Sequence, residues 1–140
     1  MQIFELINQG AEDLRRNQIV SHKLDSEIIL SSLLAKQREN LLTHLEQEVS
    51  EETVKNFKKL ISRRSLKEPI AYILKSKEFW SKDFFVNSNT LIPRPETELL
   101  SEKVIEIFKN KKIFILDIGT GTGCILLSIL SELKNSRGIG

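Results

Sequence analysis

One seven-residue stretch, Asp117–Gly123, constrains the fold of this chain more than any other part of it. The stretch reads D-I-G-T-G-T-G, with a glycine at every second position from Gly119. It follows an apolar run over residues 113–116 and precedes a segment, 125–133, whose apolar residues have helical spacing. A continuous apolar run is typical of a parallel strand that is covered on both faces. Strand, glycine-rich turn and helix together predict the opening of a doubly wound α/β domain.

The same stretch indicates the kind of cofactor. Glycines allow a tight turn and the close approach of a ligand, and the following helix N-terminus offers free N–H groups. A dinucleotide fingerprint, G-x-G-x-x-G/A, would need a third small residue where Cys124 stands. The carboxylate of Asp117 would repel a pyrophosphate, but it would attract a ligand that carries an ammonium and a sulfonium group. The pattern therefore favours S-adenosylmethionine over a nicotinamide cofactor.

Residues 1–67 predict a small helical bundle. The segment contains one glycine and no proline, which favours helices. Ser50 is the predicted N-cap of one helix, with two glutamates in its positive first turn, and Ser21 and Asp25 are possible caps of another. Apolar residues recur at helical spacing in three groups: Ile3, Leu6, Ile7 and Leu14; Ile28, Ile29, Leu33 and Leu34; Val54, Phe57, Leu60 and Ile61.

The character of the sequence changes at Pro69. Two short aromatic runs, 78–80 and 84–86, flank three polar residues, which predicts a β-hairpin. Because buried aromatic residues usually serve packing, we expect them to seal the joint between two domains. The stretch L-I-P-R-P-E-T-E over residues 91–98 forbids a helix before Pro95, where a new helix can begin.

Composition narrows the function classes. The net charge of +2, from 21 basic and 19 acidic residues, gives no argument for nucleic-acid binding. With Cys124 as the only cysteine, an internal disulfide and a cysteine metal cluster are excluded, and we expect that thiol to serve packing. No signal peptide and no run of ~20 apolar residues is present, so we expect a cytoplasmic protein that binds no membrane. His22 and His44 lack a second ligand at metal spacing, and we expect no metal site.

One basic group leaves two interpretations open. Five basic residues fall on a single predicted helix: Lys55, Lys58, Lys59, Arg63 and Arg64. They form either a solvated face or a docking surface for an acidic partner.

Several stretches in order resemble one family. They are Arg63-Arg64, E-P-I-A-Y-I over 68–73, the two aromatic runs, L-I-P-R-P-E-T-E over 91–98, and I-L-D-I-G-T-G-T-G over 115–123. This series closely resembles the HemK/PrmC family, whose members methylate the glutamine of the Gly-Gly-Gln motif in peptide chain release factors. The resemblance covers nearly the whole chain and is weakest before residue 50.

The resemblance implies three regions and a reaction. Residues 1–70 would be a helical domain that docks class I release factors, 71–90 a β-hairpin linker, and 91–140 the incomplete start of a class I, Rossmann-like methyltransferase domain. The enzyme would be a cytoplasmic protein N5-glutamine methyltransferase, expected to be monomeric and without direct nucleic-acid contact. The residues that match the family's contacts to S-adenosylmethionine are Asp117, Gly119, Thr120, Gly121, Thr122 and Gly123 in the loop, with Arg94 and Glu96 in a turn near the methionine end of the cofactor.

Two features of the family are missing. They are the acidic residue that holds the ribose hydroxyls and the Asn-Pro-Pro-Tyr motif that orients the substrate amide; residues 137–140 look like the start of the strand before the former. We therefore expect an N-terminal fragment without catalytic residues and without activity, and a sheet that leaves apolar faces uncovered. Two alternatives stay open: a methyltransferase that acts on nucleic acid or another protein, and a non-catalytic fragment that binds release factors.

Overall fold

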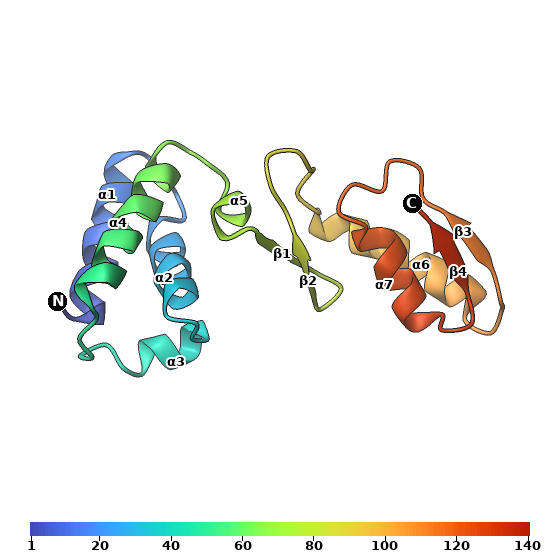
Figure 1. Cartoon of the computed structure of the whole chain (residues 1–140), viewed down its shortest axis with the longest axis horizontal. Helices are drawn as coiled ribbons and strands as arrows, with labels where there is room; N and C mark the ends of the chain where they lie inside the picture. Colours follow the sequence, from blue (N-terminus) through green and yellow to red (C-terminus); the bar gives the residue numbers. More distant parts are fainter. The chain divides into compact units, whose positions relative to one another are not determined.

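The computed structural model describes residues 1–140 and is of the α/β class. The chain forms two compact units, Met1–Leu74 and Lys75–Gly140, each of which is considered by itself (Figure 1). The sequence predicts a boundary after residue 70 and a separate hairpin linker. The contacts divide the chain after Leu74 and group the hairpin with the second unit.

The first unit contains five helices and no strand, in agreement with the helical bundle predicted for residues 1–67. Gln2 forms an isolated antiparallel bridge with Glu48, which ties the start of the chain to the segment before α4. The long helices α1, α2 and α4 pack against one another. The five helices are α1 (Ile3–Arg16), α2 (His22–Leu33), α3 (Arg38–Leu42), α4 (Glu51–Ser65) and α5 (Ile70–Leu74).

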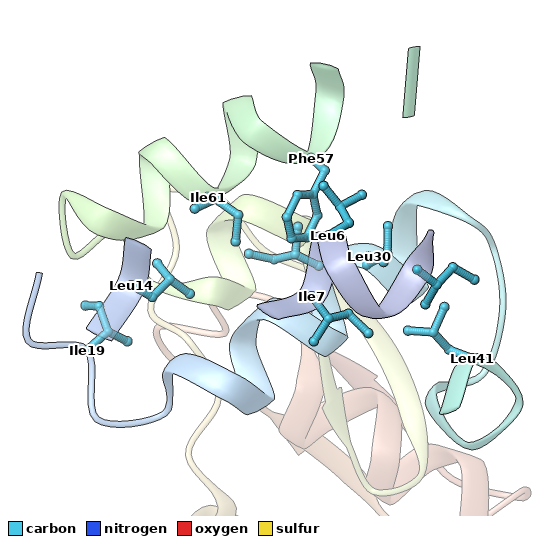
Figure 2. Close-up of a cluster of buried hydrophobic side chains, with 10 residues drawn as sticks. Leu6, Ile7, Leu14, Ile19, Leu30, Leu41, Phe57 and Ile61 are labelled. Carbon is cyan, nitrogen blue, oxygen red and sulfur yellow. The ribbon is translucent and has the colours of Figure 1, made fainter. Parts of the chain in front are cut away.

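A single apolar core lies between these helices, and Figure 2 shows its side chains directed toward one another. The predicted apolar groups supply most of it, and Phe57 from α4 is its largest member. Burying one such side chain contributes about 1.5–3 kcal/mol, which makes this cluster the main source of stability. The buried members are Ile3, Leu6, Ile7, Leu14, Ile19, Ile29, Leu30, Leu41, Phe57 and Ile61.

The predicted caps have different outcomes. Ser50 is the N-cap of α4, and its Oγ accepts a hydrogen bond from the Thr53 N–H at 3.1 Å, which confirms that prediction. Ser21 occupies the cap position of α2, but its side chain caps no backbone N–H. Its hydroxyl donates instead to Oδ2 of Asp25 at 2.8 Å.

Helix α2 carries several buried polar residues that have hydrogen-bond partners. Nδ1 of His22, at the start of the helix, is buried without one. The carboxylate of Asp25 accepts from Nε of Arg64 at 2.7 Å, and that of Glu27 accepts from Nε of Arg38 at 2.7 Å. The buried Ser26 hydroxyl donates to the carbonyl of Ile7 on α1 at 2.7 Å. These bonds offset the cost of removing polar groups from water.

Gly10 allows α1, α2 and α4 to approach closely. A Cβ atom at this position would lie 2.6 Å from Cζ of Phe57 and 2.8 Å from Oγ of Ser26. Because neither neighbour lies at the flexible end of a surface side chain, an alanine would force the packed helices apart.

The second unit begins with the predicted hairpin and continues with alternating helices and short strands. Strand β1 (Ser76–Phe79) pairs antiparallel with β2 (Lys82–Phe85). A single 3-10 turn, η1 (Pro95–Thr97), has Pro95 at its first position, as predicted, and leads into α6 (Glu98–Phe108). Strand β3 (Phe114–Leu116), α7 (Cys124–Glu132) and β4 (Arg137–Ile139) follow.

Strands β3 and β4 lie parallel, with Phe114 opposite Arg137 and Leu116 opposite Ile139. The sequence predicts that the apolar run before the glycines is covered on both faces. This is wrong, because Phe114 and Leu116 are 65% and 64% exposed. Helix α7 covers only the other face, where Leu126 is buried and a Cβ atom on Gly138 would lie 2.5 Å from its Cδ1. The expectation of uncovered apolar faces is therefore confirmed.

The hairpin is fixed to the rest of the second unit by its aromatic residues. Phe79 and Phe84 meet edge to face, with ring centroids 6.3 Å apart, and they pack against Cys124 at the start of α7. The Trp80 N–H donates to Oε1 of Glu98 on α6 at 2.7 Å, and its indole N–H donates to Oε1 of Glu132 on α7 at 3.3 Å. These aromatic residues thus form a core of the second unit itself.

Candidate cofactor-binding site

The glycine-rich loop joins the end of β3 to the start of α7. Its first residue, Asp117, still pairs with β4, because its N–H donates to the carbonyl of Ile139 at 2.9 Å. The loop then closes on itself, since the Gly123 N–H donates to the carbonyl of Thr120 at 2.8 Å. Gly123 is the N-cap residue of α7. The loop is thus a tight turn fixed between a strand and a helix N-terminus.

All three glycines of the loop have a left-handed backbone. The φ angles are +79° at Gly119, +56° at Gly121 and +78° at Gly123. Other residues adopt this conformation only with strain, which explains why glycine stands at every second position. A Cβ atom on Gly119 would meet nothing within 4 Å, and one on Gly121 would meet only the carbonyl oxygen of Gly119 at 3.9 Å. The space beside the loop backbone is therefore open to a ligand.

Asp117 supplies the charged group of the site. Its Oδ2 is buried and has no hydrogen-bond partner within the chain. Buried carboxylate oxygens are rarely left unsatisfied, and an exception at a loop of this kind indicates a partner from outside the chain. An ammonium or hydroxyl group of a ligand would satisfy this oxygen. The loop and Asp117 thus fit a cofactor that carries positive charge.

Two threonines alternate with the glycines. The hydroxyl of Thr122 accepts from the Cys124 N–H at 3.4 Å, a long contact at the first turn of α7. A Cβ atom on Gly140 would lie 2.5 Å from Oγ1 of Thr120, which places Thr120 beside the residue that follows β4. Both side chains are half-buried and help to shape the loop.

Arg94 and Glu96 lie elsewhere in the second unit. Arg94 is the residue before η1, and its carbonyl accepts from the Thr97 N–H at 3.0 Å. Both side chains are exposed, and neither forms an ion pair or a side-chain hydrogen bond. The structure therefore brings together the loop residues and shows no contact between them and Arg94 or Glu96.

Away from the loop, two glutamates make contacts with the hairpin that the sequence does not predict. Glu98 and Glu132 each accept a hydrogen bond from Trp80 and so hold the hairpin beside α6 and α7. Cys124, in contrast, is buried against Phe79 and Phe84, which confirms its interpretation as a packing residue. No three His, Cys, Asp or Glu side chains gather where they could hold a metal ion. None of the helices combines the length and the apolar character that crossing a bilayer requires.

Comparison with known families bears on the first unit. Residues 5–74 match the family model described as the PrmC N-terminal domain. The chain belongs to this family. The match ends at Leu74, the residue at which the contacts also divide the chain.

Individual relatives extend the similarity through the glycine loop. The release factor glutamine methyltransferase of Buchnera aphidicola subsp. Acyrthosiphon pisum is 40% identical over 140 residues, which are all of this chain and 50% of that protein. Those of Aliivibrio fischeri and Leptospira interrogans are 41% and 42% identical, over 100% and 95% of this chain and 49% and 47% of theirs. The chain therefore spans about half the length of the PrmC-family relatives that it matches.

Proposed function

We propose that this chain is the N-terminal portion of a protein N5-glutamine methyltransferase. The reaction transfers a methyl group from S-adenosylmethionine to the glutamine of the Gly-Gly-Gln motif in class I release factors, in the cytoplasm. Membership of the PrmC family and the names of the relatives support the substrate class. The observation that carries the cofactor assignment is the loop, in which an orphaned carboxylate oxygen lies beside an open, left-handed glycine backbone.

The proposal divides the work between the two units. The helical unit docks the release factor, and the second unit begins a Rossmann-like cofactor domain. Support for the latter comes from the order of β3, the glycine loop, α7 and the parallel strand β4. In such domains ligands bind at the carboxyl ends of the strands, which is where the loop lies.

Chemically, the proposed cofactor supplies a methyl group bound to a sulfonium sulfur. Asp117 would hold the ammonium group by charge and hydrogen bonding, since Oδ2 has no other partner. Gly119 and Gly121 would let the cofactor lie against the backbone. Bound there, the cofactor would supply the methyl group that replaces a hydrogen of the substrate amide. Groups that orient this amide are not assigned to the present chain.

The test uses a fusion of residues 1–140 to the second half of the Aliivibrio fischeri relative. The measurement is the incorporation of labelled methyl into the Gly-Gly-Gln glutamine of a class I release factor. We expect the fusion to transfer methyl groups and the 140-residue chain alone to transfer none. Gly121→Val should abolish transfer, because a β-branched residue is strained at φ +56° and its side chain occupies the open face of the loop.

A control variant separates loop damage from a general loss of fold. Leu99→Val changes an exposed residue of α6 and should leave transfer unchanged. Release-factor binding should survive in the Gly121→Val fusion, because the helical unit is untouched. Full activity of that variant would refute the cofactor assignment, and robust transfer by residues 1–140 alone would refute the division of labour.

A further inference from the structure

A basic hollow lies in the second unit, at the other end of β3 and β4 from the glycine loop. It has a volume of about 570 Å³. The residues that line it belong mainly to the turns that lead into β3 and β4, and the course of these turns can be followed in Figure 1. Its lining includes four lysines, Lys109, Lys111, Lys112 and Lys134, and the amides of Asn110 and Asn135. Glu132 is the one acidic residue of the lining, so the charge of the hollow is 4 − 1 = +3.

The two turns are fixed to each other by the backbone and by Ser136. The hydroxyl of Ser136 accepts from the Ile113 N–H at 3.2 Å and lies 3.5 Å from the carbonyl oxygen of Lys111, to which it donates. The Arg137 N–H donates to the carbonyl of Ile113 at 3.0 Å. Lysines that are distant in sequence are therefore held around one hollow in the folded chain.

None of these four lysines forms an ion pair with an acidic residue, although a lysine on the neighbouring helix α6 does. Lys103 on α6 forms an ion pair with Glu106 at 2.7 Å, whereas none of the four lysines of the hollow forms one. Lys111 lies over the ring of Phe108, 5.4 Å from its centroid, and Glu132 accepts a bond from the Trp80 indole. The C-terminal ends of α6 and α7 lie at this hollow and carry partial negative charge, which balances about one lysine at each end. The remaining positive charge attracts an anion from solution.

The lining indicates the class of that anion. All its cations are lysines, which act as point charges toward phosphate, whereas a planar carboxylate is matched better by the fork of an arginine. Asparagine amides add neutral donors of the kind that contact phosphate oxygens. The lining contains no aromatic residue on which a base could stack.

We propose that this hollow binds the phosphodiester backbone of a nucleic-acid strand, without reading its sequence. The balanced charge of the whole chain conceals such a site, because its acidic residues lie mainly elsewhere. The proposal does not depend on methyl transfer, since it concerns the opposite end of the strands. It revises the expectation, drawn from net charge, that no nucleic acid is bound.

The test measures binding of the full 140-residue chain by fluorescence anisotropy. The probes are labelled oligouridylate and oligothymidylate of about twelve nucleotides and a polyglutamate peptide of similar length, over a series of salt concentrations. We expect both nucleic acids to bind with similar affinity. The logarithm of the binding constant should fall with the logarithm of salt concentration with a slope of about −2 to −3, which corresponds to three or four neutralised phosphates.

Two triple variants with equal charge change locate the site. K111Q/K112Q/K134Q should lower affinity roughly tenfold or more and reduce the salt slope by about 2. K55Q/K58Q/K59Q removes three exposed lysines from α4 and should change affinity less than about twofold. Circular dichroism checks that both variants keep the fold.

Three results would overturn the proposal. Equal losses in the two triple variants would assign binding to net charge, and polyglutamate binding as tight as that of RNA would assign the hollow to acidic peptides. If neither nucleic acid binds at low salt, the hollow is not a nucleic-acid site.

Discussion

Arg63 and Arg64 are adjacent in sequence, yet they reach partners in different environments. Arg63 binds Glu68, whose side chain is 33% exposed, and the guanidinium holds the pKa of that carboxyl below its ordinary value. Arg64 binds Asp25, whose side chain is 7% exposed, and also donates to the carbonyl of Glu68 at 3.0 Å. The same residue type should therefore matter differently at the two positions.

We expect Arg64→Ala to lower the free energy of unfolding by about 3 kcal/mol, because it leaves the buried carboxylate of Asp25 without a cation. Arg63→Ala breaks a solvent-screened pair and should cost about 0.5 kcal/mol. Urea unfolding followed by circular dichroism measures both. Equal losses would show that burial of the partner does not decide the effect. Arg64→Ala/Asp25→Asn, which removes the stranded charge, should recover part of the loss.

For charged residues, the sequence shows their position on a helix, but it does not show which partners they bind. It places both arginines at the negative end of a helix, but the partner of Arg64 lies 39 residues away. Only the packing of α2 against α4 brings Asp25 within reach. The glycine loop is the opposite case, because its backbone conformation is local and the positions of the glycines predict it. The buried, unpartnered oxygen of Asp117 again depends on the surroundings and is visible only in the structure.

Among the elements, the hairpin combines a predicted fold with an unexpected turn. Trp80 and Ser81 form the two-residue turn with φ of 53° at both positions. Such turns favour Asn-Gly or Asp-Gly, and a bulky residue is strained there. The two hydrogen bonds of Trp80, to Glu98 and Glu132, compensate for this strain.

Glu98→Ala should therefore destabilise the second unit. Loss of the charged acceptor of the Trp80 N–H is expected to cost about 1–2 kcal/mol. Trp80 is the only tryptophan of the chain, so its fluorescence reports directly on this contact. We expect a shifted emission spectrum and a lower unfolding midpoint followed by fluorescence.

Glu96→Ala is the matched control for stability. It removes an exposed acid two residues away that has no hydrogen-bond partner, and it should change stability by less than about 0.5 kcal/mol. Identical spectra and midpoints for the two alanine variants would contradict the role assigned to Glu98.

Strand β3 shows what the apolar pattern of a sequence can predict and what it cannot. The apolar run correctly predicts a parallel strand before the glycines. Whether such a strand is covered depends on which elements pack over it, and in this structure α7 lies on one face only. Helix α5 was not expected, because five residues after Pro69 are too few to show a period.

On the scale of the whole molecule, each unit has a core of its own. The ten buried residues of the helical core all lie within residues 1–74, and Ile70 of α5 packs against them. The second unit has a smaller cluster of Phe79, Phe84 and Cys124, with Trp80 and Ile125 at its edge. Its other buried apolar residues are Val86, Leu126, Ile129 and Leu133. The change of sequence character at Pro69 anticipates this division within a few residues.

We expect residues 1–74 alone to show strong helical circular dichroism and a cooperative thermal melt. A unit of this size is of marginal stability, but its core is complete. Residues 75–140 alone should bind a hydrophobic dye, because β3 and its surroundings expose large apolar side chains. A featureless spectrum for residues 1–74 would contradict the independence of the helical unit.

The three glycines of the loop are the only glycines of the chain with a left-handed backbone, and this bears on chirality. An L-residue avoids the φ angles found at these positions, and a D-residue would prefer them, because the two are mirror images. Between β3 and α7 the chain thus reverses its hand at every second residue. Glycine is the one genetically encoded residue that is indifferent to hand. Substitution of the threonines between the glycines therefore leaves the backbone unstrained, whereas substitution of any of the three glycines strains it.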